Sequence, residues 1–135
     1  MQKNKKLVYT ILLFLILSVL TIDVSSKNND IPCWNNDWSY REEITIPIKT
    51  NEESAEYQPI DIYFEFKNKC WGKNETAHSI RTCCWSNNKW YELENQIYNI
   101  EHEDSESYIE KCGIIFLIPE FADGNERYFI YYVKK

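Results

Sequence analysis

The stretch that decides the fold runs from Cys112 to Tyr132 and reads Cys-Gly-Ile-Ile-Phe-Leu-Ile-Pro, Glu-Phe-Ala-Asp-Gly-Asn-Glu, Arg-Tyr-Phe-Ile-Tyr-Tyr. Its two ends are apolar and rich in β-branched and aromatic residues, whereas Pro119 and the Asp-Gly-Asn at 123–125 are typical of turns. We predict a β-hairpin here, with two strands joined by this turn. Because an isolated hairpin is only marginally stable in water, the rest of the chain must supply a second sheet to cover it.

The clearest alternation of apolar and polar residues lies between residues 59 and 67. One face of this segment carries four large apolar side chains, those of Ile60, Ile62, Phe64 and Phe66. A period of two residues indicates a strand with one buried face. Each of these side chains is worth about 1.5–3 kcal/mol when it is fully buried. We therefore expect this row to anchor the interface between the sheets.

Three further segments are predicted to be strands. Residues 38–48 end in an alternation of Ile44, Ile46 and Ile48 with Thr45 and Pro47. Because proline cannot donate to a strand ladder, Pro47 predicts that this strand lies at a sheet edge or places that nitrogen outward. Residues 79–85 form a short predicted strand, and turn residues separate it from residues 90–100. The period of residues 90–100 is mixed, and it favours a strand over the alternative, a short helix. Roughly six or seven short strands joined by polar turns predict an all-β fold, an antiparallel β-sandwich of the immunoglobulin-like or jelly-roll-like kind.

Residues 1–26 have the composition of an export signal. Three lysines precede an apolar run from Leu7 to Ile22, and small residues follow this run at positions 25 and 26. We expect an N-terminal hydrophobic helix that is either a cleaved signal peptide or a retained anchor. In both cases the body is secreted or lies at the cell surface. The predicted organisation is a leader over 1–26, a linker over 27–37 and a β-sandwich domain over 38–135.

The charge of the body excludes several classes of partner. The chain has 15 basic and 21 acidic residues, and residues 1–26 contain three lysines and one aspartate, so the body has a net charge of −8. Nucleic acids are held by clustered lysine and arginine, and no such cluster occurs here. We therefore predict no nucleic-acid partner, and contact with a membrane only through an uncleaved N-terminal segment.

Five cysteines lie in the exported body, where disulfides are the default state. Cys83 and Cys84 are neighbours in a predicted strand, so their side chains should point to opposite faces. We predict that one of them closes a loop with Cys70, and that Cys33 and Cys112 form a second bridge. A zinc site is the alternative, but the sequence has no Cys-x-x-Cys pair and no histidine at ligand spacing, so we predict no metal and no cofactor.

Several short motifs occur in a fixed order along the body. They are Trp38-x-Tyr-Arg, Gln58-Pro-Ile-Asp-Ile, Ser79-Ile-Arg, Glu94-x-Gln96-Ile97, Ile115-Phe-Leu-Ile-Pro and Glu126-Arg-Tyr-Phe-Ile-Tyr-Tyr. The ordered set, which covers residues 38–132, resembles a β-sandwich module found at the N-terminus of exported archaeal and bacterial proteins, some with polysaccharide-active regions. The resemblance implies an extracellular accessory or structural module and brings no catalytic residues. The cysteines and tryptophan-rich loops depart from the pattern.

The sequence contains no recognisable catalytic set. A nucleophile activated by histidine needs a serine or cysteine on a strained turn, and no Gly-x-Ser-x-Gly elbow is present. We predict that His78 is an exposed loop residue. Asp61 and Glu65 share one strand face at a separation of roughly 13 Å, which exceeds the roughly 5–10 Å between the carboxylates of a glycosidase. We therefore predict that the protein is not an enzyme.

Four aromatic residues in or beside loops are the candidate binding residues: Trp71, Trp85, Trp90 and Tyr91. Flat aromatic faces beside polar side chains suit sugar rings, and the alternative is that these rings cap a small core. Asn74 begins an Asn-Glu-Thr glycosylation sequon.

We predict a non-catalytic module that binds polysaccharide or another surface protein, or has a structural role. The alternatives are an accessory subunit of a polysaccharide-degrading enzyme, or a small secreted, disulfide-stabilised hydrolase or inhibitor.

Overall fold

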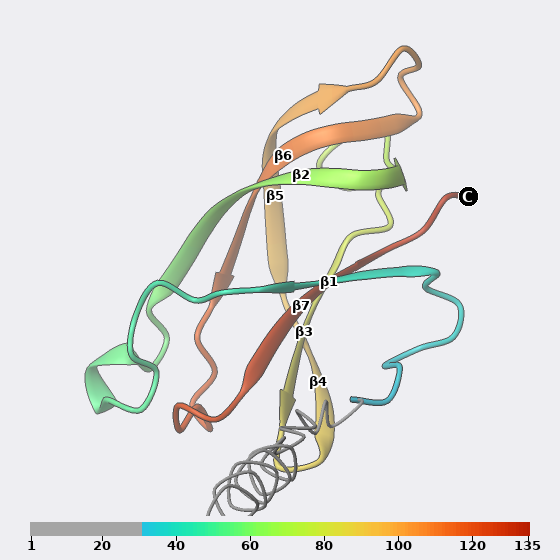
Figure 1. Cartoon of the computed structure of the whole chain (residues 1–135). Helices are drawn as coiled ribbons and strands as arrows, with labels where there is room; N and C mark the ends of the chain where they lie inside the picture. Colours follow the sequence, from blue (N-terminus) through green and yellow to red (C-terminus); the bar gives the residue numbers. More distant parts are fainter. Residues whose placement is uncertain (1–30) are drawn as a thin grey trace, which may run out of the picture. The chain divides into compact units, whose positions relative to one another are not determined.

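The computed structural model describes residues 31–135, which form one unit of two antiparallel β-sheets (Figure 1). The described residues contain no α-helix, and their only helical turn is a short 3-10 helix, η1, over Glu53–Ala55. The all-β prediction is therefore confirmed, and the two sheets are consistent with a β-sandwich. The predicted hydrophobic helix, and the whole of the leader over 1–26, lie outside the described residues.

Seven strands make up the two sheets. The first sheet has four strands in the order β1-β7-β3-β4, with β1 at Tyr40–Ile44, β7 at Arg127–Tyr132, β3 at Arg81–Ser86 and β4 at Lys89–Leu93. The second has three strands in the order β2-β6-β5, with β2 at Pro59–Trp71, β6 at Tyr108–Leu117 and β5 at Asn95–His102. Every pairing is antiparallel.

The hairpin predicted over residues 112–132 is wrong. Its two segments are strands, but β6 pairs with β2 and β5, whereas β7 pairs with β1 and β3. The intervening residues 118–126 carry the chain from one sheet to the other. β7 is apolar throughout because both of its faces are covered: Tyr128, Ile130 and Tyr132 lie in the main core, and Phe129 and Tyr131 lie in a second apolar cluster on the opposite face. A strand buried on both faces has a nearly continuous apolar sequence.

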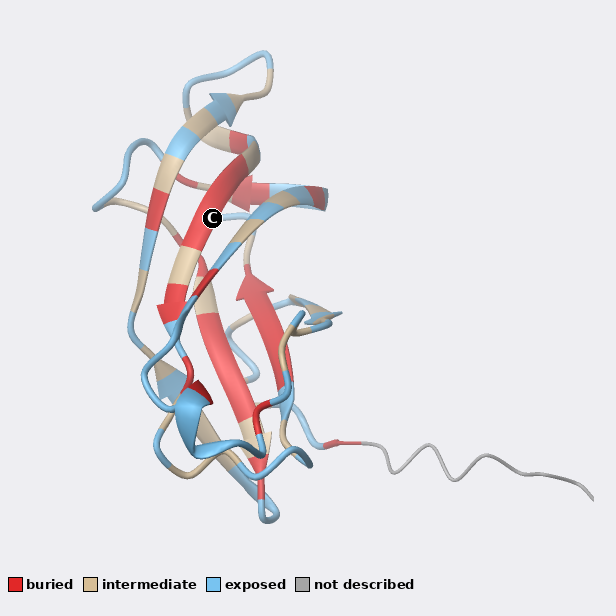
Figure 2. Ribbon diagram, turned by 90° about the vertical axis from the view of Figure 1, so that its left-hand side faces the viewer, coloured by how far each residue is buried: buried red, intermediate tan, exposed pale blue. Residues whose placement is uncertain are grey.

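The row predicted on residues 60–66 does face the core. Figure 2 colours the ribbon by the burial of each residue. Ile60 and Phe66 are 3% and 7% exposed, and Ile62 and Phe64 pack against the same core cluster. Phe66 meets Tyr132 of the other sheet edge to face, with ring centroids 4.9 Å apart. The interface between the sheets is therefore built where the alternation predicted it.

Two local predictions are refined by the structure. β1 is an edge strand, as predicted, but it ends at Ile44, so Pro47 lies in the loop that follows. The turn between β3 and β4 places Asn87 and Asn88 at φ of 50° and 58°. Left-handed backbone at both central residues is what a tight two-residue hairpin turn requires, and asparagine tolerates it well.

Candidate functional site

The structure brings together two of the four predicted aromatic residues. Trp85 and Trp90 are directly opposite each other on β3 and β4, with ring centroids 5.1 Å apart in an edge-to-face arrangement. Tyr91 is the next residue on β4, so its ring lies on the core side, against Phe121 at 4.1 Å. Trp71 ends β2 in the other sheet, with the Lys135 ammonium 4.1 Å from its ring centroid.

Four partly buried tryptophans gather on the outer surface of the four-stranded sheet. They pack over a small apolar cluster made by Ile31, Cys83, Phe129 and Tyr131. We call this surface the indole face, and its tryptophans are Trp34, Trp38, Trp85 and Trp90. Two of them, at positions 34 and 38, precede the first strand and were not among the residues predicted from the sequence. Only contacts between distant parts of the chain place them there.

The segment before β1 is bound across the indole face by hydrogen bonds. The Trp90 Nε1–H donates to the carbonyl of Pro32 at 3.0 Å, and the Trp34 backbone N–H donates to the Tyr131 hydroxyl at 3.1 Å. The Trp38 Nε1–H donates to the carbonyl of Ser79 at 2.7 Å. The predicted linker is thus packed against the sheet from residue 31 onward, and it forms part of the surface.

All three arginines of the chain lie at this face. Arg41 and Arg81 lie on either side of Tyr131 in the strand register. The Arg81 guanidinium lies 5.4 Å from the centroid of the Trp38 ring, and the guanidinium of Arg127 lies 5.5 Å from that of Phe129. Guanidinium groups over aromatic rings keep those rings oriented while leaving N–H groups available at the surface.

Two of these three arginines pair with glutamates, whereas Arg41 donates to the carbonyl of Ile31 at 2.9 Å. Glu43 accepts two hydrogen bonds from Arg127, at 2.6 and 2.5 Å, and this pairing lowers the pKa of its carboxyl group. Glu92 forms an ion pair with Arg81 at 3.3 Å. The indole face therefore combines aromatic rings with bound pairs of donors and acceptors, which is a set suited to a ligand with apolar C–H faces and many hydroxyls.

The outer surface of the three-stranded sheet is different, because its polar groups pair with one another. Tyr63 and Tyr98 flank Gly113 in one row across the sheet. The Tyr98 hydroxyl donates to Asp61 at 2.6 Å, and the Tyr63 hydroxyl donates to Glu101. Hydroxyls of both rings are thus engaged by carboxylates of this surface.

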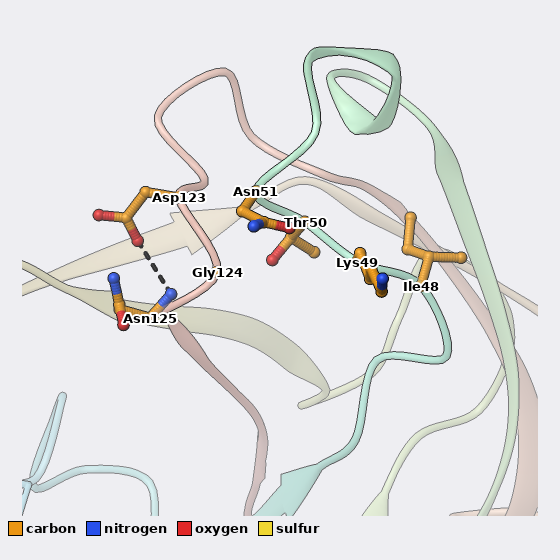
Figure 3. Close-up of a pocket in the computed structure, with 7 residues that line it drawn as sticks. All are labelled: Ile48, Lys49, Thr50, Asn51, Asp123, Gly124 and Asn125. Carbon is orange, nitrogen blue, oxygen red and sulfur yellow. Dashed lines mark hydrogen bonds between the residues drawn. The ribbon is translucent and has the colours of Figure 1, made fainter.

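The hollow in Figure 3 lies between the loop after β1 and the loop before β7, and encloses about 590 Å³. The loop before β7 contains a turn that is held by its own side chains. Asp123 Oδ1 accepts from the Asn125 N–H at 2.9 Å, and Glu126 Oε2 accepts from the Gly124 N–H at 2.8 Å. The lining contains no histidine or cysteine and a single carboxylate, that of Asp123. This lining therefore offers no pair of carboxylates.

All five cysteines are free thiols in the structure. The prediction that Cys83 and Cys84 point to opposite faces is confirmed, because Cys83 lies beneath the indole face and Cys84 lies in the main core. Burial raises the pKa of the Cys70, Cys83, Cys84 and Cys112 thiols to about 12. Cys33 is exposed in the segment before β1. The two predicted disulfide pairings stay predictions.

The prediction that His78 is an exposed loop residue is wrong. It is half-buried and forms an isolated bridge with Gly72, and its Nδ1 accepts a hydrogen bond from the Ile80 N–H at 3.2 Å. Burial, and secondarily the charge of Arg81, lowers the pKa of this imidazole. Across residues 31–135, no three histidine, cysteine, aspartate or glutamate side chains gather as metal ligands would.

Comparisons with protein families, curated proteins and solved structures found no match to this chain. No helix within residues 31–135 has the length and apolar character needed to cross a bilayer. Function is therefore inferred from the geometry of the described surfaces.

Proposed function

We propose that the chain is a non-catalytic module, secreted or held at the cell surface, that binds a carbohydrate polymer through the indole face. Export is inferred from the composition of residues 1–26. The finer description of the fold, an immunoglobulin-like or jelly-roll-like sandwich, is part of this proposal, as is the resemblance to accessory modules of exported proteins.

The gathering of four of the five tryptophans on one outer surface carries the proposal. An aromatic ring that served only to fill a core would be best placed between the two sheets, where Phe66 and Tyr132 lie. The tryptophans of the indole face are instead partly exposed, on the side of the sheet turned away from the core. Rings in that position offer apolar area to the C–H faces of sugar rings.

The charges at the indole face favour an uncharged polymer. Arg127 and Arg81 are held by Glu43 and Glu92, and Arg41 donates to the carbonyls of Ile31 and Pro32. None of the three guanidinium groups can therefore turn to an anionic ligand without losing a present partner. The paired groups still have N–H donors and carboxylate acceptors for sugar hydroxyls. An anionic polymer would also meet the net charge of −8 that the body carries.

The state of the thiols supports a non-catalytic role. The thiolate is the reactive form of cysteine, and burial keeps the Cys70, Cys83, Cys84 and Cys112 thiols protonated near neutral pH. A module of this kind could also serve beside a separate polysaccharide-degrading chain, as an accessory subunit.

The proposal is tested by co-sedimentation with a panel of insoluble neutral polysaccharides. The wild-type chain is expected to bind at least one of them, and the W85A/W90A double variant is expected to bind at least about tenfold more weakly, because each lost stacking contact costs about 0.5–1.5 kcal/mol beyond its area. Trp71→Ala is the matched control, since Trp71 ends β2 in the other sheet and is not one of the four tryptophans of the indole face, so this variant should keep its affinity. Circular dichroism checks that each variant is folded. The proposal would be overturned if the wild-type chain bound none of the polysaccharides, or if Trp71→Ala lost as much affinity as the W85A/W90A variant.

A further inference from the structure

The loop between β2 and β3 projects a single asparagine into solvent. Gly72 and His78 form a bridge that closes the loop, and the Lys73 N–H donates to the Ala77 carbonyl at 2.8 Å. The residues between them, 73–76, are all exposed. The loop is therefore fixed at its base while its tip is open to a large reagent.

The carboxamide of Asn74 is held in one orientation by the residues that follow it. Its Oδ1 accepts three hydrogen bonds, from the Thr76 N–H at 3.0 Å, the Thr76 hydroxyl at 3.0 Å and the Ala77 N–H at 2.9 Å. No hydrogen bond among the described residues uses its Nδ2. The oxygen is thus turned into the loop and the nitrogen, the atom that a glycan would join, is free on the outside.

We propose that Asn74 is a site of N-linked glycosylation, a proposal that rests on the export included in the proposed function. The co-reactant is an oligosaccharide linked through phosphate or pyrophosphate to a membrane lipid, and the catalyst is a membrane oligosaccharyltransferase. A bond forms between Nδ2 and the anomeric carbon, and the bond from that carbon to the phosphate oxygen breaks. The amide nitrogen gives up one proton to a base of the transferase, and the lipid phosphate leaves with the bonding electron pair.

The Thr76 hydroxyl explains why the threonine is part of the site. By donating to the Asn74 oxygen it draws electron density from the carboxamide, and it fixes the side chain with Nδ2 outward. Asn74-Glu75-Thr76 is the one Asn-x-Ser/Thr sequence of the chain. The related Asn68-Lys69-Cys70 sequence lacks this arrangement, because Cys70 is fully buried and its thiol lies beside the Ser79 hydroxyl.

The loop that carries Asn74 and the tryptophan pair of the indole face lie at different positions along β3. The loop lies just before the first residue of β3, Arg81, whereas Trp85 lies four residues further along that strand. At about 3.3 Å per residue this places Trp85 roughly 13 Å from the start of β3.

The test uses the full chain with an added cleavable secretory leader, expressed in a eukaryotic host whose secretory pathway glycosylates asparagine. Protein collected from the secretory compartments and the medium is analysed by intact mass, endoglycosidase digestion and peptide mapping. We expect one glycan, attached at Asn74. Asn74→Gln and Thr76→Ala should remove it, whereas Thr76→Ser, which keeps a hydroxyl, and the matched control Asn68→Gln should retain it.

Recovery of the protein with Asn74 unmodified would overturn the proposal, as would a glycan that survives Asn74→Gln. Because the added leader supplies export, this result does not depend on residues 1–26. Polysaccharide binding is measured separately on the endoglycosidase-treated chain, so that failure of the glycosylation site and failure of the proposed binding function give different results.

Discussion

The ring of Tyr98 lies across Gly113 on the neighbouring strand, in the space that a side chain at position 113 would occupy. A Cβ built on that glycine would overlap three ring carbons of the tyrosine. The ring crosses the central strand β6, and its hydroxyl reaches Asp61 on β2. Gly113 thus allows one side chain to link all three strands of the sheet.

Gly113→Ala is expected to lower the free energy of unfolding by about 1–3 kcal/mol, the usual cost of forcing extra atoms into an occupied space. Denaturant unfolding measures the change. The same substitution in a Tyr98→Ala background should cost much less, because the ring that it displaces is gone. Equal costs in the two backgrounds would show that the ring does not occupy this position.

Truncation of Ile114 tests the burial of β6. This residue is fully buried, and Ile114→Ala should destabilise the protein by about 2–5 kcal/mol through lost burial and the cavity left behind. The control is Leu117→Ala on the same strand, where the side chain is 49% exposed and the expected change is below about 0.5 kcal/mol. Similar losses of stability in the two variants would contradict the fold described here, in which Ile114 is buried and Leu117 is exposed.

Alkylation of thiols distinguishes the exposed cysteine from the buried ones. At pH 8 under native conditions, Cys33 should react within minutes, because it is the exposed thiol. The other four should react only after unfolding, because burial blocks the reagent and raises their pKa to about 12. If Cys33 and Cys112 react only after reduction, the disulfide predicted between them is present instead.

Protonation of His78 should destabilise the folded chain. Its pKa is below 6.5 when folded, so the unfolded state takes up the proton first as the pH falls. The stability that depends on neutral His78 is therefore fully present above pH 6.5. It decreases as the pH falls below that value and stops decreasing below the folded pKa of His78. Thermal unfolding between pH 7.5 and pH 5 measures the slope, over a range where the carboxylates also contribute.

His78→Asn is the comparison for this slope, because the asparagine oxygen can accept the Ile80 N–H bond without titrating. The variant should show a flatter dependence of melting temperature on pH. An unchanged slope would mean that the imidazole is not shielded from solvent as described.

Local sequence pattern predicted most of the strands but not their partners, and the single strand predicted over 90–100 is two strands, β4 and β5, in different sheets. The alternation at residues 60–66 identified the buried face of β2 because that face follows from the period alone. The assignment of β6 and β7 to different sheets could not be predicted, since two central strands have the same apolar composition as the two arms of a hairpin. Pairing depends on contacts between distant residues, which one sequence does not display.

The same limit applied to the binding surface. Trp85 and Trp90 were predictable because both flank one tight turn, and opposite positions on a hairpin share a face. Trp34 joins them through Tyr131, 97 residues further along the chain, by a backbone hydrogen bond and by ring packing at 5.5 Å between centroids. The sequence before β1 is polar and asparagine-rich, and it predicted a linker rather than part of a site.

The most direct test of the indole face as a ligand site is a ¹⁵N NMR titration of the five indole N–H signals with a soluble oligosaccharide of whichever neutral polymer binds. The signals of Trp85 and Trp90 should shift in a saturable way, while that of Trp71, in the other sheet, stays constant. Constant Trp85 and Trp90 signals at saturation, or a response confined to Trp71, would contradict the proposal that this chain binds carbohydrate through the indole face.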